Sequence, residues 1–186
     1  MPFTLTINAD TSEITRLKSL LSHIPGAYTK AAKKSASETL RVLKKAAGEE
    51  ASKVYAMSPA RIRKAIKLYA SSGTLKVTGR RQNLSDYQIT PKSPGRKRRL
   101  LKGMVFRQGG LKSYPRGFLI HGRNSGKVLA FLRTGPGKMD IEPLTRPAVP
   151  QMMENEEVSK ALTDTAERTV LEKLKLYVSQ AVTEGR

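Results

Sequence analysis

The sequence contains no cysteine and no tryptophan, and aromatic residues make up only 5% of it. Without cysteine, the chain forms no disulfide, holds no Cys-based zinc site and has no thiolate nucleophile. Because aromatic residues are scarce, the core must consist mainly of Leu, Ile, Val, Ala and Met. No run of about 18 apolar residues occurs, so we expect no membrane span.

Residues with acid–base or metal-binding chemistry are also few and scattered. His23 and His121 lie far apart in the sequence and belong to no metal-binding spacing. Asp140 and Glu142 are interpreted as solvated charges, and Asp86 as one member of an ion pair, rather than as paired catalytic carboxylates. We therefore predict no catalytic residue, no metal site, no cofactor and no enzymatic activity.

The chain is instead rich in positive charge, which is unevenly distributed. The formal net charge is +20. Residues 1–140 hold 29 Lys and Arg against 7 Asp and Glu, a net of +22, whereas residues 141–186 hold 6 against 8, a net of −2. A field of this strength attracts polyanions and repels like-charged molecules. The charge therefore predicts a polyanionic partner, of which DNA is the leading candidate.

The apolar spacing predicts a helix-rich segment on each side of a strand-rich one. Phe3, Leu5 and Ile7 alternate with polar residues, as in a short strand. The remaining predictions are helices at about 11–22, 27–57, 59–68 and 149–182, and strands at 74–78, 84–90, 102–108, 116–121 and 127–133. This order predicts an α+β fold, in which a mainly antiparallel β-sheet packs against two long helices, one N-terminal and one C-terminal. We expect a single domain spanning residues 1–186.

The densest basic segment lies between the predicted strands. Residues 91–103, PKSPGRKRRLLKG, contain six Lys and Arg and no acid. We predict an exposed, flexible loop at about 91–102. Because no known motif that reads nucleic-acid sequence is present, contact is expected with the phosphate backbone, without sequence preference. The expected contact residues are Lys76, Arg80, Arg81, Lys92, Arg96, Lys97, Arg98, Arg99 and Lys102.

Several segments, taken in order, resemble a known family. VLAFLRTG at 128–135, IEPLTRPAVPQMMEN at 141–155 and the long helix that follows resemble the minor tail protein Z family of tailed bacteriophages, also called tail completion proteins. AKKSASETLRVLKKAAGEEASKVYAMSPARIRKAI upstream is similar to the long helix of that family, and the resemblance covers roughly residues 25–180. The residues at the matching motif positions are Arg133, Pro147, Val149, Pro150, Gln151 and Met152.

The resemblance implies a virion structural protein in the neck, at the head-proximal end of the tail. It implies assembly in the host cytoplasm, and a role in joining the tail to the head and positioning the DNA end. The implied partners are further copies of the chain in a hexameric ring, the tail terminator, the tail tube, the head–tail connector and genomic DNA. The alternative is a free nucleic-acid-binding protein without sequence preference. An enzyme acting on nucleic acid is disfavoured because the sequence has no acidic metal-binding cluster.

Overall fold

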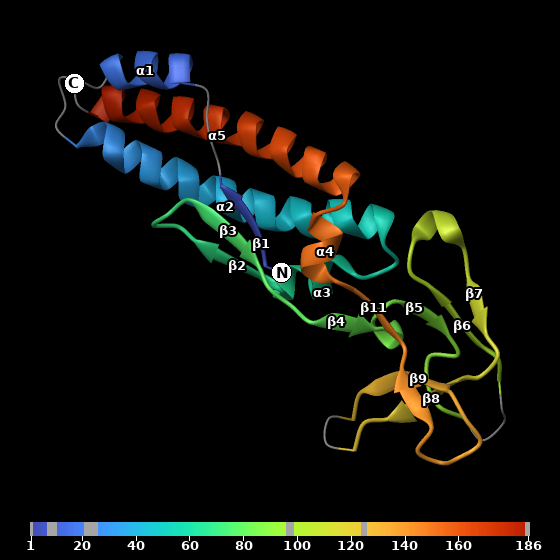
Figure 1. The fold of residues 1–186 in the computed structure, drawn as a ribbon. Helices are drawn as coiled ribbons and strands as arrows, with labels where there is room; N and C mark the ends of the chain where they lie inside the picture. The colour runs from blue at the N-terminus through green and yellow to red at the C-terminus, as the bar shows by residue number, and fades with distance from the viewer. Residues whose placement is uncertain (1, 7–10, 21–25, 96–98, 124–125, 185–186) are drawn as a thin grey trace.

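The computed structural model describes residues 2–6, 11–20, 26–95, 99–123 and 126–184 (Figure 1). Two long helices and exclusively antiparallel strand pairs over these residues confirm the predicted α+β class. Ile7 and His23 lie outside the described residues. The elements are β1 Phe3–Thr6, α1 Thr11–Leu20, α2 Ala27–Val54, α3 Pro59–Lys64, β2 Ile66–Tyr69, β3 Thr74–Val77, β4 Arg81–Asn83, the 3-10 helix η1 Leu84–Asp86, β5 Gln88–Thr90, β6 Leu101–Met104, the 3-10 helix η2 Arg107–Gly109, β7 Lys112–Tyr114, β8 Gly117–His121, β9 Val128–Arg133, β10 Ile141–Pro143, β11 Thr145–Ala148, α4 Val149–Met153 and α5 Glu156–Glu184.

The described strands form four small sheets rather than one. Their orders are β1–β3–β2, β5–β6–β7, β10–β9–β8 and β11–β4. Figure 1 shows α2 lying along the first sheet, whereas the strands from β5 to β10 gather at the other end of the molecule. The sheets stay small because each strand is only three to six residues long and is soon ended by a turn. The helix α2 therefore packs against the first sheet, whereas β5, β6, β8 and β9 bury side chains in a separate core.

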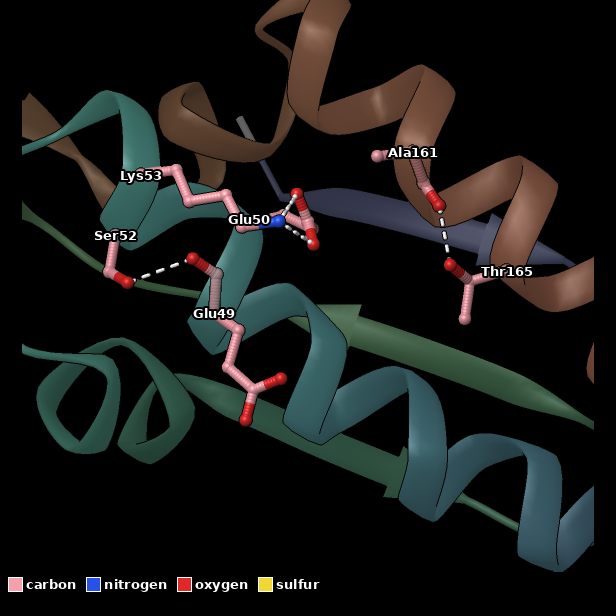
Figure 2. A network of polar contacts seen from close by, with 6 residues as sticks. All are labelled: Glu49, Glu50, Ser52, Lys53, Ala161 and Thr165. Atoms are coloured by element: carbon pink, nitrogen blue, oxygen red, sulfur yellow. Dashed lines mark hydrogen bonds and ion pairs between the residues drawn. The ribbon is translucent and has the colours of Figure 1, made fainter.

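The helices α2 and α5 lie side by side, and both contribute to the main core together with α3, α4 and the first sheet (Figure 1). Leu40, Leu43 and Ala47 of α2 recur at helical spacing and pack in one cluster with Val158 and Leu162 of α5. Figure 2 shows polar contacts beside this core, among them an ion pair of 2.7 Å between Lys53 Nζ and Glu50 Oε1. The inner faces of both helices thus carry apolar residues at helical spacing.

Polar contacts join the two helices further along. The Ser35 hydroxyl donates to the carbonyl oxygen of Val170 at 3.1 Å. Lys173 Nζ lies 2.8 Å from Glu38 Oε2, and this contact holds the pKa of the Glu38 carboxyl below its usual value. These contacts set the register of α2 against α5.

Thr39 is a weak point of this helix pair. Its side chain is 0% exposed, and its hydroxyl has no hydrogen-bond partner among the described residues. We expect Thr39→Val to raise the free energy of unfolding by about 1 kcal/mol, because it keeps the shape and removes an unsatisfied buried hydroxyl. Urea denaturation measures the change. Ser35→Ala is the matched control and should lower the same quantity by about 1 kcal/mol, since that hydroxyl is bonded. A Thr39→Val protein less stable than wild type would contradict the prediction.

The short helix α3 is held against α2 by a glycine. A Cβ on Gly48 would lie 2.8 Å from Arg63 Cγ and 3.0 Å from the carbonyl oxygen of Pro59. The absence of a side chain at Gly48 therefore allows the two helices to approach closely.

The predicted helix at 59–68 is too long, because α3 ends at Lys64 and Ile66–Tyr69 form β2. Pairing of β2 with β3 overrides the helical pattern of this segment.

Other boundaries also differ from the prediction, for local reasons. The first three residues of the expected strand at 84–90 form η1, so that only 88–90 are a strand. The expected strand at 102–108 ends at Met104 before η2, and the expected C-terminal helix is interrupted between Met153 and Glu156. The strands β4, β7, β10 and β11 were not predicted. They are three or four residues long, too short for alternation to reveal, and two of them contain proline.

A second core supports the strand-rich end of the molecule. It consists of Leu84, Ile89, Leu101, Leu119, Ala130 and Leu144, and Val105 packs against both this cluster and the main one. Asn83 connects β4 to β9 here, because its amide nitrogen donates to the carbonyl oxygen of Ala130 at 2.9 Å. Its amide oxygen accepts from the backbone N–H of the same alanine at 2.8 Å. The Asn83 side chain therefore forms with Ala130 the two hydrogen bonds that the backbone of a neighbouring strand would form.

Candidate nucleic-acid interface

An open groove lies at the strand-rich end of the molecule and has a volume of about 1400 Å³. It exceeds the roughly 300–1,000 Å³ of a pocket built for one small ligand. The size and openness of the groove fit a polymer better than a metabolite. Its described lining is formed by residues 90–95, 99–102, 116–119 and 133–136.

The charge of this groove is entirely positive over its described lining. Among the described lining residues, five carry cationic side chains and none carries a carboxylate. They come from the segment before β6, from β6 itself, from the β7–β8 turn and from the end of β9. All five are exposed, so the positive field they create reaches solvent. The five residues are Lys92, Arg99, Lys102, Arg116 and Arg133.

Arg133 is held in place by two contacts. Its Nη1 donates to the carbonyl oxygen of Gly137 at 2.8 Å, and its guanidinium carbon lies 5.5 Å from the centre of the Phe118 ring. A cation above an aromatic face is attracted by the ring's negative charge density. Arg133 is therefore pre-positioned at the edge of the groove, which lowers the ordering cost of binding an anion.

Strand β8 supplies residues 117–119 to the groove lining and is paired with β9. Strands β8 and β9 are in register at Phe118–Phe131 and Leu119–Ala130. Ala130 is 0% exposed, and Asn83 binds it from the other side. This pairing fixes the relative positions of the segments that carry Arg116 and Arg133.

The structure brings together part of the predicted DNA-contact set. Lys92, Arg99 and Lys102 converge in the groove, and Arg133, assigned from the family motif, joins them. Sequence reasoning missed Arg116, a single cation in the Tyr-Pro-Arg-Gly turn before β8 with no basic neighbours to mark it. The pairing of β8 with β9 places it beside Arg133, and both residues line the groove with the other three cations.

The remaining predicted contact residues lie elsewhere. Lys76 is half-buried in β3, the central strand of the first sheet, while Arg80 and Arg81 are exposed where the chain enters β4. None of these three lines the groove. Arg96, Lys97 and Arg98 lie outside the described residues.

The other motif residues build the start of α4 rather than the groove. Val149, Pro150 and Met152 are buried, and the amide oxygen of Gln151 accepts from the backbone N–H of Ala148 at 2.9 Å. The carbonyl oxygen of Pro147 accepts from the Tyr87 hydroxyl at 2.9 Å. Burial raises the pKa of that tyrosine, so its hydroxyl stays protonated and able to donate. We infer a packing role for this motif.

The isolated acid of the basic region has the predicted role. Asp86 forms an ion pair with Arg61 and also accepts from the backbone N–H of Asn83 at 3.3 Å. It therefore joins η1 to α3, away from the groove lining.

Over the described part of the chain, no group of three or more His, Asp or Glu side chains is placed to hold a metal ion, and no helix is long and apolar enough to cross a membrane.

Comparisons of the chain with protein-family models, with curated proteins and with solved structures found no match.

Proposed function

We propose that this chain is a structural protein that holds DNA by its phosphate backbone without reading its sequence. The observation that carries the proposal is the groove, whose described lining contains no carboxylate and five cations, Lys92, Arg99, Lys102, Arg116 and Arg133. Lys and Arg side chains that neutralise phosphates release counterions and so bind in a salt-dependent way. They provide affinity and orientation but carry no base-specific information.

We further propose that the protein is a component of the neck of a tailed bacteriophage and is similar to the tail completion proteins. The support for this step is the order of the motif segments over roughly residues 25–180. The distribution of charge is consistent with it, since residues 1–140 are strongly basic and residues 141–186 have a net charge of −2. A neck protein has to contact both DNA and neighbouring proteins. The basic residues 1–140 suit contact with DNA, and the slightly acidic residues 141–186 suit contact with proteins.

The groove proposal predicts a specific loss of DNA binding. Replacing Lys92, Arg99, Lys102 and Arg116 together by Gln should weaken binding to a short duplex about 100-fold at low salt, because four phosphate contacts are removed. The slope of log affinity against log salt should become shallower by about 3 to 4. Fluorescence anisotropy across about 50 to 200 mM salt measures both quantities.

The control removes the same charge from another surface. Lys30, Lys33, Arg41 and Lys45 are exposed on α2, far along the chain from the groove residues. Replacing these four by Gln should leave the salt slope close to that of wild type. Equal losses in the two variants would show that only net charge matters and would rule out the groove as the binding site. A monomer that binds DNA tightly and ignores purified tail tubes would favour the free nucleic-acid-binding alternative.

A further inference from the structure

A tight turn at 134–140 joins β9 to β10 at the rim of the groove. Gly135 and Pro136 of this turn line the groove. Met139, on the same turn, is 87% exposed, more than any other large hydrophobic side chain among the described residues. Single exposed apolar residues are common on protein surfaces, so this exposure alone carries no functional meaning. What distinguishes Met139 is the construction of the turn that presents it.

Backbone and side-chain hydrogen bonds fix this turn. The carboxylate of Asp140 accepts from the backbone N–H of Gly137 at 2.8 Å, and its own carbonyl oxygen accepts from the N–H of Thr134 at 2.9 Å. The carbonyl oxygen of Met139 accepts from the N–H of Ile141 at 2.8 Å. Asp140, interpreted from the sequence as a solvated charge, is therefore the anchor of the turn.

The glycines of the turn are required by this anchor. A Cβ added to Gly137 would lie 2.9 Å from Asp140 Oδ2, and one added to Gly135 would lie closer still. The turn is thus packed around a single carboxylate. It is also tied to the groove, because Gly137 accepts the hydrogen bond from Arg133.

We propose that Met139 is an apolar wedge that enters between neighbouring bases of duplex DNA whose backbone lies in the groove. This inference rests on the proposed function and names the residue that contacts the bases. Proteins that bend DNA combine cations on the backbone with an inserted Met, Leu, Ile, Phe or Pro side chain. Here Lys138 precedes the exposed methionine, and Arg133 bonds Gly137 of the same turn, which does not need to be ordered on binding.

The wedge has a consequence for DNA preference. Partial insertion unstacks a base step, and pyrimidine–purine steps such as TA and CA are the easiest to unstack. The protein therefore prefers flexible steps over stiff A-tracts, although it reads no base by hydrogen bonding. This preference comes from DNA deformability and is compatible with the absence of a sequence-reading motif.

The test uses the full-length protein and duplexes with 2-aminopurine at a central TA step. Wild type should raise the fluorescence of the probe on binding, because unstacking relieves its quenching. Met139→Ala should abolish that rise and weaken binding about tenfold, the loss expected for one apolar side chain that is no longer buried. Leu176→Ala is the matched control, since Leu176 is 45% exposed on α5, and it should bind as wild type does.

A second pair of variants separates the wedge from simple charge effects. Removing the carboxylate in Asp140→Ala would strengthen DNA binding if electrostatics alone mattered. The wedge requires the opposite, a loss of affinity and of the fluorescence rise, because the turn loses its anchor. Asp140→Asn keeps an oxygen that accepts from Gly137, so it should retain both.

The outcomes distinguish the two proposals. Wild-type binding with no rise in fluorescence, or Met139→Ala behaving as wild type, overturns the wedge and leaves the groove intact. Tighter binding by Asp140→Ala also overturns it. No binding of duplex DNA by wild type removes both the proposed function and the wedge. Loss of contact with a protein partner in Met139→Ala, with DNA binding unchanged, would assign the turn to that partner instead.

Discussion

Leu43→Ala is expected to lower the free energy of unfolding by about 4 kcal/mol. Leu43 lies in the middle of α2, is 0% exposed, and belongs to the cluster that α2 forms with α5, α3 and the first sheet. Truncation removes apolar contacts and leaves a cavity, and a site bounded on several sides by different elements cannot easily collapse to fill it. Chemical denaturation followed by far-ultraviolet circular dichroism measures the loss.

The neighbouring residue provides a matched control for this prediction. Val42 is 37% exposed on the same helical turn of α2, so Val42→Ala should change the free energy of unfolding by no more than about 0.5 kcal/mol. The two variants differ mainly in which face of the helix is truncated. Similar losses in both would mean that α2 does not pack as described.

Asn83→Ala is expected to lower the free energy of unfolding by about 3 kcal/mol, although it removes no apolar contact of the core. The side-chain amide bonds both backbone groups of Ala130, and its oxygen also accepts from the N–H of Ser85 at 3.0 Å. Without it, the buried N–H of Ala130 is left unpaired, and an unsatisfied buried donor costs about 1–3 kcal/mol. The cap of η1 is lost as well.

This prediction also links stability to the groove. Because Ala130 lies on β9 opposite Leu119 of the groove lining, Asn83→Ala should weaken DNA binding along with folding. Gln82→Ala is the control. Its amide nitrogen donates to the nearby carbonyl oxygen of Arg80, so the loss should stay within about 0.5 kcal/mol. Asn83→Asp keeps the acceptors but loses the donor to Ala130, so it should destabilise the protein too. An Asn83→Ala protein as stable as Gln82→Ala would contradict this reading of the second core.

The site was predictable only in part, and the reason lies in how its residues are distributed. Lys92, Arg99 and Lys102 stand in a dense basic segment, which local composition is enough to detect. Arg116 and Arg133 are single cations in unremarkable surroundings, and strand pairing brings them to the same groove. Conversely, Lys76 has the same charge as the groove residues but is placed in the first sheet, outside the groove. Charge count does not distinguish these cases, because proximity depends on contacts distant in sequence.

Local pattern was sufficient for features that depend on neighbouring residues. Periodicity and composition predict the inner faces of α2 and α5, the α+β class and the concentration of charge before residue 141. Each of these features depends on residues that are close in sequence. Tertiary structure decided the rest. The strands form several small sheets, residues 66–69 form a strand where the sequence predicts a helix, and Asp140 anchors a turn. Each of these depends on hydrogen bonds or packing with partners that local periodicity does not identify. The positive charge was evident from the sequence, whereas its convergence into one groove beside an exposed methionine required the fold.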